Sequence, residues 1–459
     1  MTQRENTVLS LSSAAVYLVP CLTSQGWINM GSTEDVNCDI LVVGGGIFGT
    51  STAYHLALTY PNPSRVILLD RGAVPSPQAA SSDINKIVRA DYSNTLYMDL
   101  AYEAMQHWLE TPFLKPFFHQ TGWVMLDEKD SDLSDRIRTN FGQSGRPDTS
   151  ADITLDEVKS RWGGVLAGID TTDYAKAYTN SSAGWADASL AVEAMMKEAV
   201  ALGVKYQVGE VGELVTDGNS VTGVRTEDGR RYSAPKIVLA TGAWTPWLMR
   251  PLEKSLGISE TQSIRKQIQA AGVCVAAFQL SAVEAEHYSR MPVLVYGARG
   301  EVMPPNQDRY FKFTNAHSFT NICQHPSGES VSVPVAEQKV VPEKLKAESI
   351  EIIRQRVPEI LDNGRVPDDW RVCWDAISPD QNQLICQHPD PRLSNLYLAT
   401  AGSFHSWKFL PNIGRYVVNV LNGKSNGFEK DQAWQWKTKW SARGSHEKVL
   451  PRRDFQDFV

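Results

Sequence analysis

The sequence predicts an α/β protein with a doubly wound parallel sheet and a second, smaller domain. Three separated segments carry this prediction, at residues 39–70, 235–244 and 395–421. Each begins with an apolar run and continues into small residues and glycine, which is typical of a buried parallel strand that leads into a helix. The simplest arrangement is one sheet assembled from three parts of the chain, with the intervening segments forming the second domain.

The first segment contains a complete β–α–β unit. Residues 40–43 form an apolar run that indicates a buried strand. A helix is expected next, because Ala53 and Leu56 lie on one face at helical spacing. A second apolar run at 66–69 ends in Asp70, which completes the unit.

The intervening segments predict a mixed sheet with flanking helices. Within 122–184, the stretch GWVMLDE indicates a strand and TLDEVKSRW a polar helix. Within 261–369, QSIRKQIQAAGVCVAAF and RYFKFT alternate like strands, and VPEKLKAESIEIIRQRV reads as a charged helix.

Composition and charge exclude several function classes. Hydrophobic residues make up 42% of the chain and charged residues 21%, which is typical of a core-forming globular protein. The chain has 45 Lys and Arg against 52 Asp and Glu, a formal net charge of −7, so no nucleic-acid partner is expected. The 6 cysteines form neither a CxxC pair nor a zinc-like cluster with histidine, so no metal site is expected.

The strongest apolar run, at residues 8–22, is too short to span a bilayer, which takes about 20 residues. Its flank lacks a clear positive region, so we expect an unstructured extension over residues 1–36, with a signal peptide as the alternative. We predict an intracellular protein, cytoplasmic or peroxisomal, without a membrane partner, and a monomer or weak homo-oligomer.

A glycine turn follows the first predicted strand. Gly44, Gly46 and Gly49 form G-x-G-x-x-G, which permits a tight turn, close approach of a pyrophosphate and close helix–strand packing. The helix N-terminus offers free N–H groups to phosphate. Asp70 stands where an acid accepts hydrogen bonds from ribose. This context predicts a Rossmann-like dinucleotide-binding domain.

A second small-residue turn favours FAD over NAD as the dinucleotide. It is the segment ATGAW, with Thr241, Gly242 and Trp244. Many flavoproteins close such a turn over the cofactor.

Four separated motifs then carry a family resemblance. They are GGGIFG, SSDINKIVR at 81–89, RVCW at 371–374 and GSFHSWKFLPNIG at 402–414. With these motifs in this order, the chain resembles the monomeric sarcosine oxidase and fructosyl amino acid oxidase (amadoriase) family of FAD-dependent amine oxidases, in wording closest to fungal members. We expect an FAD-binding domain from 37–121, 185–260 and 371–425, a substrate domain from 122–184 and 261–370, and a C-terminal tail over 426–459.

The resemblance implies a covalent cofactor. Cys373 stands where the family carries FAD as an 8α-S-cysteinyl thioether, and a thiolate can attack the electrophilic flavin methyl group. The implied cofactor-binding positions are Gly44, Gly46, Ile47, Phe48, Gly49, Asp70, Arg71, Ser81, Ser82, Lys86, Val211, Thr241, Gly242, Trp244, Cys373, Gly402, Phe404 and Lys408.

The resemblance also implies four catalytic positions. Arg89 and Lys408 stand where the family clamps a substrate carboxylate, with a planar fork and a point charge. Lys312 matches a lysine near flavin N5, where a cation stabilises superoxide while oxygen is reduced. His405 could tune or position the amine.

Two departures from the family pattern concern the substrate pocket. Enzymes that act on fructosyl amino acids carry an acidic residue four positions after the flavin-site lysine, and here that position is Ala316, followed by His317. The tyrosine near the family's covalent-cysteine motif is replaced by Asp375. We therefore expect a pocket that has diverged from both prototypes.

The predicted reaction is oxidation of the C–N bond of a carboxylate-bearing secondary amine to an imine, with O2 reduced to hydrogen peroxide. Candidate substrates are N-methyl amino acids, fructosyl amino acids, L-pipecolate, L-saccharopine, and a secondary-metabolite amine whose imine closes a ring. An FAD dehydrogenase with another electron acceptor is the alternative from a different class, and a flavin-binding protein without catalysis is a third.

Overall fold

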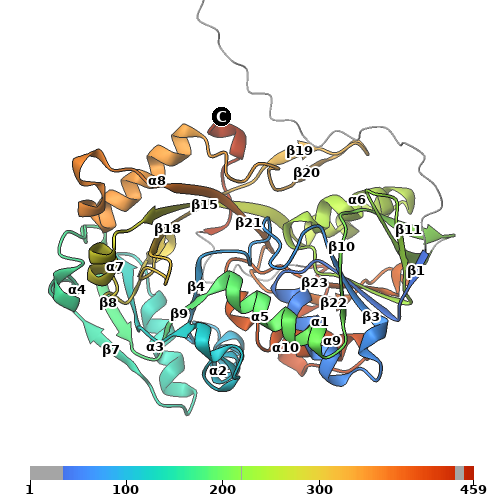
Figure 1. The fold of residues 1–459 in the computed structure, drawn as a ribbon, viewed down its shortest axis with the longest axis horizontal. Helices are drawn as coiled ribbons and strands as arrows, with labels where there is room; N and C mark the ends of the chain where they lie inside the picture. Colours follow the sequence, from blue (N-terminus) through green and yellow to red (C-terminus); the bar gives the residue numbers. More distant parts are fainter. Residues whose placement is uncertain (1–34, 219, 440–448) are drawn as a thin grey trace, which may run out of the picture.

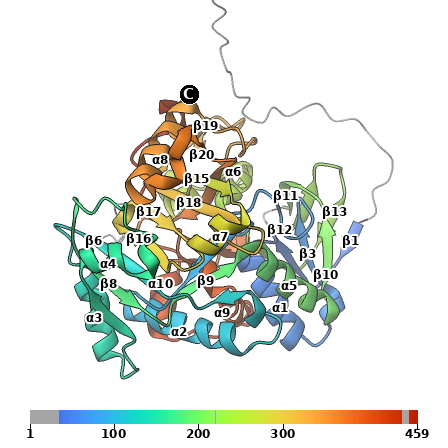
Figure 2. The same ribbon diagram turned by 60° about the vertical axis from the view of Figure 1, so that its left-hand side comes forward.

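Two large sheets form the two sides of the molecule (Figure 1). The computed structural model describes residues 35–218, 220–439 and 449–459. In Figure 1, β3, β22 and β23 lie on the right and β7 and β8 on the far left, and in the turned view of Figure 2 β3 and β8 again lie on opposite sides. The apolar run at 8–22 lies outside the described residues.

The first sheet has six strands, and all but one are parallel. In spatial order they are β10 (Lys205–Val208), β3 (Val66–Asp70), β2 (Ile40–Val43), β14 (Lys236–Leu239), β23 (Leu396–Thr400) and β22 (Leu384–Gln387), with β22 antiparallel to β23. The central pairs β2–β3, β2–β14 and β14–β23 join the three segments found in the sequence. The prediction of one sheet from three parts of the chain is therefore confirmed.

Burial on both faces explains why β2 is a continuous apolar run. Ile40 and Val42 pack on the side of α1 (Ile47–Thr59), whereas Leu41 and Val43 pack on the opposite side. On the first side α1 lies against α5 (Ala188–Ala201) and α9 (Ile413–Leu421). The opposite side is covered by a small mixed sheet and α6 (Thr245–Ser255), where a doubly wound fold would place only helices.

The second large sheet has eight strands and is mixed, as predicted. Its order is β21 (Asp369–Ile377), β15 (Gln269–Gln279), β18 (Tyr310–Phe319), β17 (Gly300–Val302), β16 (Val293–Tyr296), β6 (Trp123–Glu128), β8 (Tyr174–Asn180) and β7 (Ser150–Ile153). Pairs in this sheet are antiparallel except β16–β6. Because β21 pairs along its length with β15, we propose that the FAD-binding segment expected at 371–425 begins after Ile377.

The remaining elements cover these sheets and connect them. The small sheets are β1 (Asp35–Asn37), β13 (Arg231–Ser233), β12 (Ser220–Thr226) and β11 (Val211–Asp217); β4 (Asn85–Val88), β9 (Gly184–Asp187) and β5 (Phe118–His119); and β19 (Ile322–Gln324) with β20 (Ser330–Ser332). The other helices are α2 (Thr95–Glu110), α3 (Leu133–Gln143), α4 (Leu155–Ser160), α7 (Ala282–Tyr288), α8 (Glu343–Arg356) and α10 (Phe428–Trp434).

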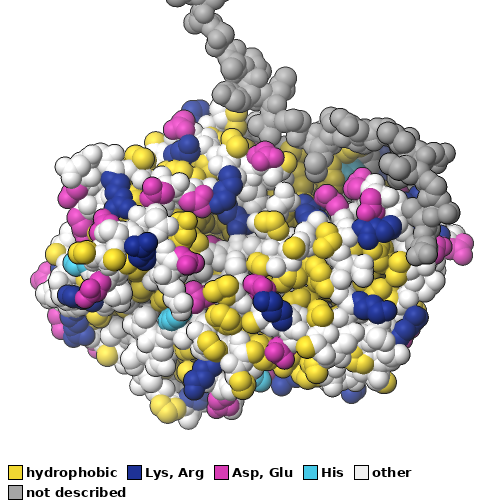
Figure 3. All heavy atoms as spheres, in the orientation of Figure 1, with side chains coloured by type: hydrophobic (Ala, Val, Ile, Leu, Met, Phe, Trp, Pro, Cys, Tyr) yellow, Lys and Arg dark blue, Asp and Glu magenta, His cyan; other side chains and the backbone are white. Residues whose placement is uncertain are grey.

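The face shown in Figure 3 carries basic and acidic side chains interspersed with one another. Such mixing agrees with the small net charge of the chain. Within the described part of the chain, no helix combines the length and hydropathy that a membrane crossing requires.

Candidate active site

A cavity of about 1650 Å³ runs between the six-stranded and the eight-stranded sheets. Its wall includes the glycine turn after β2 and residues of β17, β18 and β21. Strand ends and loops from both sheets therefore face one continuous space, whose wall includes positions from Gly44 to Lys408.

The glycine turn is packed so closely that side chains would not fit. Gly44 has φ +104°, and a Cβ there would lie 2.4 Å from the Ala240 carbonyl oxygen. A Cβ at Gly49 would lie 1.7 Å from the Gly44 carbonyl oxygen, so the third glycine lets α1 approach β2. The Asp70 carboxylate accepts the Gly45 N–H at 2.6 Å and so holds the turn against the end of β3.

Most predicted cofactor positions line this cavity. They are Gly44, Gly46, Ile47, Phe48, Asp70, Arg71, Ser81, Lys86, Val211, Thr241, Gly242, Trp244, Cys373, Gly402, Phe404 and Lys408. Gly49 and Ser82 do not line it, because Gly49 faces the turn and the Ser82 hydroxyl donates to the Ser76 carbonyl. On the cavity wall, the Arg71 guanidinium lies 4.6 Å above the Trp244 ring.

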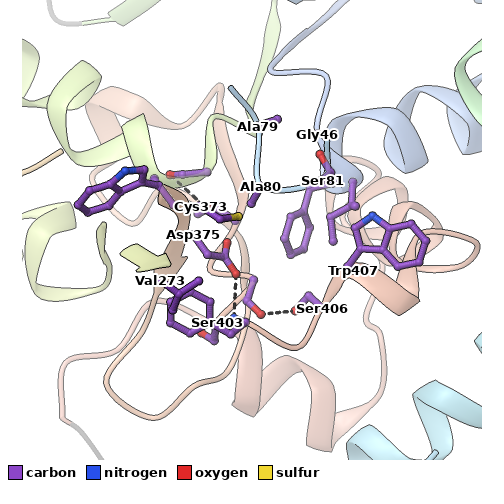
Figure 4. Close-up of a pocket in the computed structure, with 18 of the residues that line it drawn as sticks. Gly46, Ala79, Ala80, Ser81, Val273, Cys373, Asp375, Ser403, Ser406 and Trp407 are labelled. Carbon is purple, nitrogen blue, oxygen red and sulfur yellow. Dashed lines mark hydrogen bonds between the residues drawn. The ribbon is translucent and has the colours of Figure 1, made fainter. Parts of the chain in front are cut away.

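Cys373 and Asp375 lie next to each other on the cavity wall that β21 provides (Figure 4). They share a face because they are two residues apart on a strand. Cys373 is 4% exposed and packs against Val273 and Val275 of the neighbouring β15. Burial raises the pKa of Asp375, whose carboxylate accepts the Phe404 N–H at 2.8 Å.

The Phe404 N–H that binds Asp375 belongs to a strained loop after β23. Ala401, Ser403 and Phe404 have φ values of 66°, 50° and 62°, a region that residues other than glycine rarely adopt. A Cβ at Gly402 would lie 2.8 Å from both Asp375 carboxylate oxygens, so the loop packs tightly on this carboxylate. The loop leads directly into His405 and the short 3-10 helix Trp407–Phe409.

Arg89 lies on the cavity wall between two aromatic rings. Its guanidinium carbon is 4.4 Å from the Tyr92 ring centroid and 4.9 Å from that of Trp123, and its Nη1 donates to the Asp91 carbonyl. The Asp91 carboxylate is fully buried and accepts a hydrogen bond from the Tyr178 hydroxyl at 3.0 Å. Burial raises the pKa of Asp91 to about 6.

Lys408 is buried at the cavity end of the strained loop. Its Nζ donates to the Tyr92 hydroxyl at 3.0 Å and to the His405 carbonyl at 2.6 Å. Burial, and then the positive charge of Arg89, hold the pKa of Lys408 well below its usual range. His405 contacts the Gln381 carbonyl through Nε2 at 2.8 Å and the Tyr92 hydroxyl through Nδ1 at 3.3 Å.

Lys312 is 1% exposed and lies behind the cavity surface. Its Nζ donates to the Asp83 carboxylate at 2.8 Å, and Lys86, which does line the cavity, lies 2.7 Å from the same Asp83 oxygen. Burial alone would raise the pKa of Asp83, but the cations Lys312, Lys86 and Arg371 hold this pKa well below its usual range. Burial lowers the pKa of Lys312, and the neighbouring Lys86 lowers it further.

Several residues of this site carry no strong signal in the sequence. Asp83 lies within the SSDINKIVR motif and Tyr92 lies three residues after it. Closeness in sequence to Lys86 and Arg89 was therefore the one available clue to these two residues. Glu301, from the short strand β17, also lines the cavity. Nothing in its local sequence distinguishes it from a solvated acid.

The cavity has the features that a dinucleotide needs at one end. A side-chain-free turn opens at the N-terminus of α1, and a Cβ at Gly46 would approach the Ser81 hydroxyl to 3.3 Å. The family model for FAD dependent oxidoreductases matches residues 39–420, most of the chain. The chain belongs to this family. Its residues at the glycine turn and along the cavity fit FAD.

Known relatives of this oxidoreductase include L-saccharopine oxidase from Schizosaccharomyces pombe, which is 28% identical over 87% of this chain and 93% of the relative. The amino acid oxidase fsqB from Aspergillus fumigatus is 26% identical over 83% of this chain and 91% of the relative. Among solved structures, the deglycating fructosamine oxidase Amadoriase II from Aspergillus fumigatus is 27% identical, with a TM-score of 0.77, over 92% of this chain and 96% of that one. The resemblance drawn from the four motifs is confirmed.

In the part of the chain that the structure describes, no group of three or more His, Cys, Asp or Glu side chains could hold a metal ion.

Proposed function

We propose that this FAD-dependent oxidoreductase oxidises the C–N bond of a carboxylate-bearing secondary amine, an N-substituted amino acid, to an imine. One observation carries the proposal. The cavity that the glycine turn lines is also lined by Cys373 and by the cations Arg89 and Lys408. The relatives named as oxidases of amino acids or related amines point to the same class of reaction.

Arg89 and Lys408 would bind the substrate carboxylate. Tyr92 fixes both groups, because its ring stacks on the Arg89 guanidinium and its hydroxyl accepts the Lys408 Nζ–H. The lowered pKa of Lys408 means that a buried ammonium is disfavoured until an anion enters. A carboxylate would restore its charge, which makes this end of the cavity selective for anionic groups.

FAD, when bound, supplies the two-electron oxidation and returns the electrons to O2, which becomes hydrogen peroxide. Gly44 and Gly46 would hold its pyrophosphate. Cys373 Sγ would form a thioether with the flavin 8α-methyl carbon in place of one C–H bond; the thiol and methyl hydrogens would leave as protons, and the two electrons would pass through the flavin ring to O2. Lys312 would place a positive charge close to where oxygen is reduced, with Asp83, which also binds the cavity residue Lys86, orienting it. His405 would position the amine.

The imine would then be hydrolysed by water or captured within the substrate, as in ring closure during secondary metabolism. L-Saccharopine, L-pipecolate, N-methyl amino acids and fructosyl amino acids are the substrates to test first. An intracellular location, cytoplasmic or peroxisomal, and a monomeric or weakly oligomeric state also stay predictions, and size-exclusion chromatography tests the latter.

The first experiment separates covalent from dissociable flavin. We expect yellow colour to stay with the acid-precipitated protein, and to appear in the supernatant for Cys373→Ala. Colour in the supernatant of the wild-type protein would show that Cys373 does not bind the cofactor covalently.

A peroxide assay with secondary amino acids tests the reaction itself. We expect hydrogen peroxide from at least one carboxylate-bearing secondary amine, and a KM at least roughly tenfold higher in Arg89→Ala, because a charge-assisted hydrogen bond to the carboxylate is lost. Flavin bleaching without peroxide would instead indicate a dehydrogenase with another acceptor. If no amine produced either flavin bleaching or peroxide, this result would contradict the proposal.

A further inference from the structure

Two adjacent strands place polar groups on the cavity wall at a position that the proposed reaction does not use. Glu301 of β17 is paired directly with Thr314 of β18. Opposite residues of an antiparallel pair share a face, as do alternate residues of one strand, so Glu301, Thr314 and Ala316 face the same side. All three line the cavity, whereas Val302 and Phe313 face the core on the other side.

Glu301 is half-buried, and its carboxylate forms no hydrogen bond or ion pair with any residue that the structure describes. Burial lowers the pKa values of Lys312 and Lys408, and the negative charge of Glu301 partly opposes this by favouring the charged forms of these lysines and of Lys86. These lysines already have closer partners, Asp83 for Lys86 and Lys312 and the Tyr92 hydroxyl for Lys408. The Glu301 charge is therefore near cations but is not neutralised by contact.

Thr314 supplies a second polar group beside Glu301. It is 6% exposed, and within the described ranges its hydroxyl oxygen has no hydrogen-bond partner. Buried hydroxyl groups are nearly always hydrogen-bonded, so an unpartnered one on a cavity wall indicates a position for a bound group or water. Ala316, two residues along β18, adds only a methyl group and leaves room at this wall.

The backbone holds this pair of strands in place. The Tyr296 hydroxyl lies 3.2 Å from the Glu301 carbonyl and 3.1 Å from the Thr314 carbonyl. Gly300 has φ +140°, and a Cβ there would lie 1.9 Å from the Thr314 carbonyl oxygen. Glu301 thus extends from a closely packed segment, which holds its backbone in place on the cavity wall.

We propose that Glu301, with Thr314 beside it, binds a primary ammonium group of the substrate that does not react. This inference rests on the proposed amine oxidation and narrows its substrate to secondary amino acids that also carry a primary ammonium. A carboxylate and a hydroxyl both accept hydrogen bonds, and an ammonium donates three. The reacting nitrogen must lose its proton before oxidation, and a carboxylate at that nitrogen would oppose the loss. Arg89 and Lys408 would bind the carboxylate, and Glu301 the ammonium group that does not react.

Paired substrates with Glu301→Gln test the proposal. Nα-Methyl-L-lysine carries a second ammonium, and Nα-methyl-L-norleucine has the same carbon chain without it. We expect Glu301→Gln to lower kcat/KM for the lysine derivative roughly 10- to 100-fold through KM, because one charge-assisted hydrogen bond is lost. The norleucine derivative should be unaffected. The control Glu343→Gln, which removes the same charge at an exposed site on α8, should change neither.

An equilibrium measurement tests the subsite without turnover. By calorimetry, L-lysine should bind the flavin-loaded wild-type protein more tightly than L-norleucine, and Glu301→Gln should abolish the difference. If Glu301→Gln weakened the binding or the kcat/KM of the lysine and the norleucine compounds equally, the proposal would be overturned. If no secondary amine yields peroxide, the proposed function fails, and a lysine preference that depends on Glu301 would still support the subsite.

Discussion

Asp91 is a buried acid whose ionisation the fold opposes. Burial raises its pKa from an ordinary value of 3.8 to about 6, although Arg89 and hydrogen bonds from Asn180 and Tyr178 favour the charged form. The folded state therefore prefers the protonated acid. Its contribution to stability is fully present below about pH 4 and is lost as the pH rises through about 6.

We predict that Asp91→Asn removes this loss. Relative to the variant, the wild-type protein should lose about 3 kcal/mol in its free energy of unfolding between pH 4 and pH 7, since each unit of pKa shift corresponds to about 1.4 kcal/mol. Urea unfolding at a series of pH values measures it. The altered hydrogen bonds to Asn180 add a constant cost, so the slope with pH is the readout. Parallel pH profiles for the two proteins would show that Asp91 is ionised in the fold without penalty.

At the scale of single residues, the sequence identified site residues that lie within the family motifs. It missed residues that reach the site only because the chain folds. Cys373 and Lys408 lie on the cavity as the resemblance implied, while their roles stay predictions. Lys312 is buried and not outward-facing on its strand, because Asp83 reaches it from a segment 229 residues away in sequence. Glu301 lies outside every motif, so no local pattern could indicate it.

The short strand β17 depends on a glycine that no other residue can replace without strain. Gly300 combines φ +140° with backbone contact to Thr314. Gly423 also has a positive φ, but a Cβ there would have no atom within 4 Å, so this glycine isolates the cost of the backbone conformation alone.

We predict that Gly300→Ala lowers the free energy of unfolding by about 3 kcal/mol or more, and Gly423→Ala by about 1 kcal/mol, since the second incurs only the φ penalty. Thermal unfolding of both variants measures the difference. Gly300→Ala should also weaken any preference for a second ammonium, because Glu301 is the next residue. Equal costs at the two glycines would mean that β17 shifts easily away from β18.

Strand positions were the most predictable elements. The runs at 40–43 and 66–69 became β2 and β3, because a continuous apolar run fits a strand that is buried on both faces. The sheet to which β21 belongs was less visible. The resemblance assigned its RVCW motif to the cofactor site and gave no sign of its neighbouring strand. That neighbour is β15, which lies about 100 residues earlier in the chain, and hydrophobic periodicity does not indicate pairing between such distant segments.

For the whole molecule, the cavity is lined by residues of both large sheets. The glycine turn follows β2 of the six-stranded sheet, and Cys373 is in β21 of the eight-stranded sheet. FAD bound at both would therefore stabilise the two sheets together. The α/β class and the mixed second sheet were predictable, because they follow from strand patterns. The four-stranded cover on one face of the six-stranded sheet was not, since β1 and β13 have only 3 residues each and β11 is buried at only two of its 7 residues.

We predict that added FAD leaves the Tm of the wild-type protein unchanged but raises that of Cys373→Ala. A dissociable ligand stabilises by mass action, by about 1.4 kcal/mol for each tenfold excess over Kd, whereas a covalent one is already saturating. Differential scanning fluorimetry over a series of FAD concentrations measures both. A wild-type Tm that climbs with FAD would contradict covalent attachment.

The three-part origin of the six-stranded sheet also has a consequence during synthesis on the ribosome. β2 is made early, but its inner neighbour β14 emerges about 200 residues later, and β23 about 150 residues after that. At roughly 5–20 residues per second, the inner edge of β2 waits on the order of 10–40 s for its partner. An apolar strand with open hydrogen-bonding groups is a template for aggregation during that interval. The nascent chain should therefore depend on chaperones until β14 is released, and slower translation before that point should lower the yield of folded enzyme.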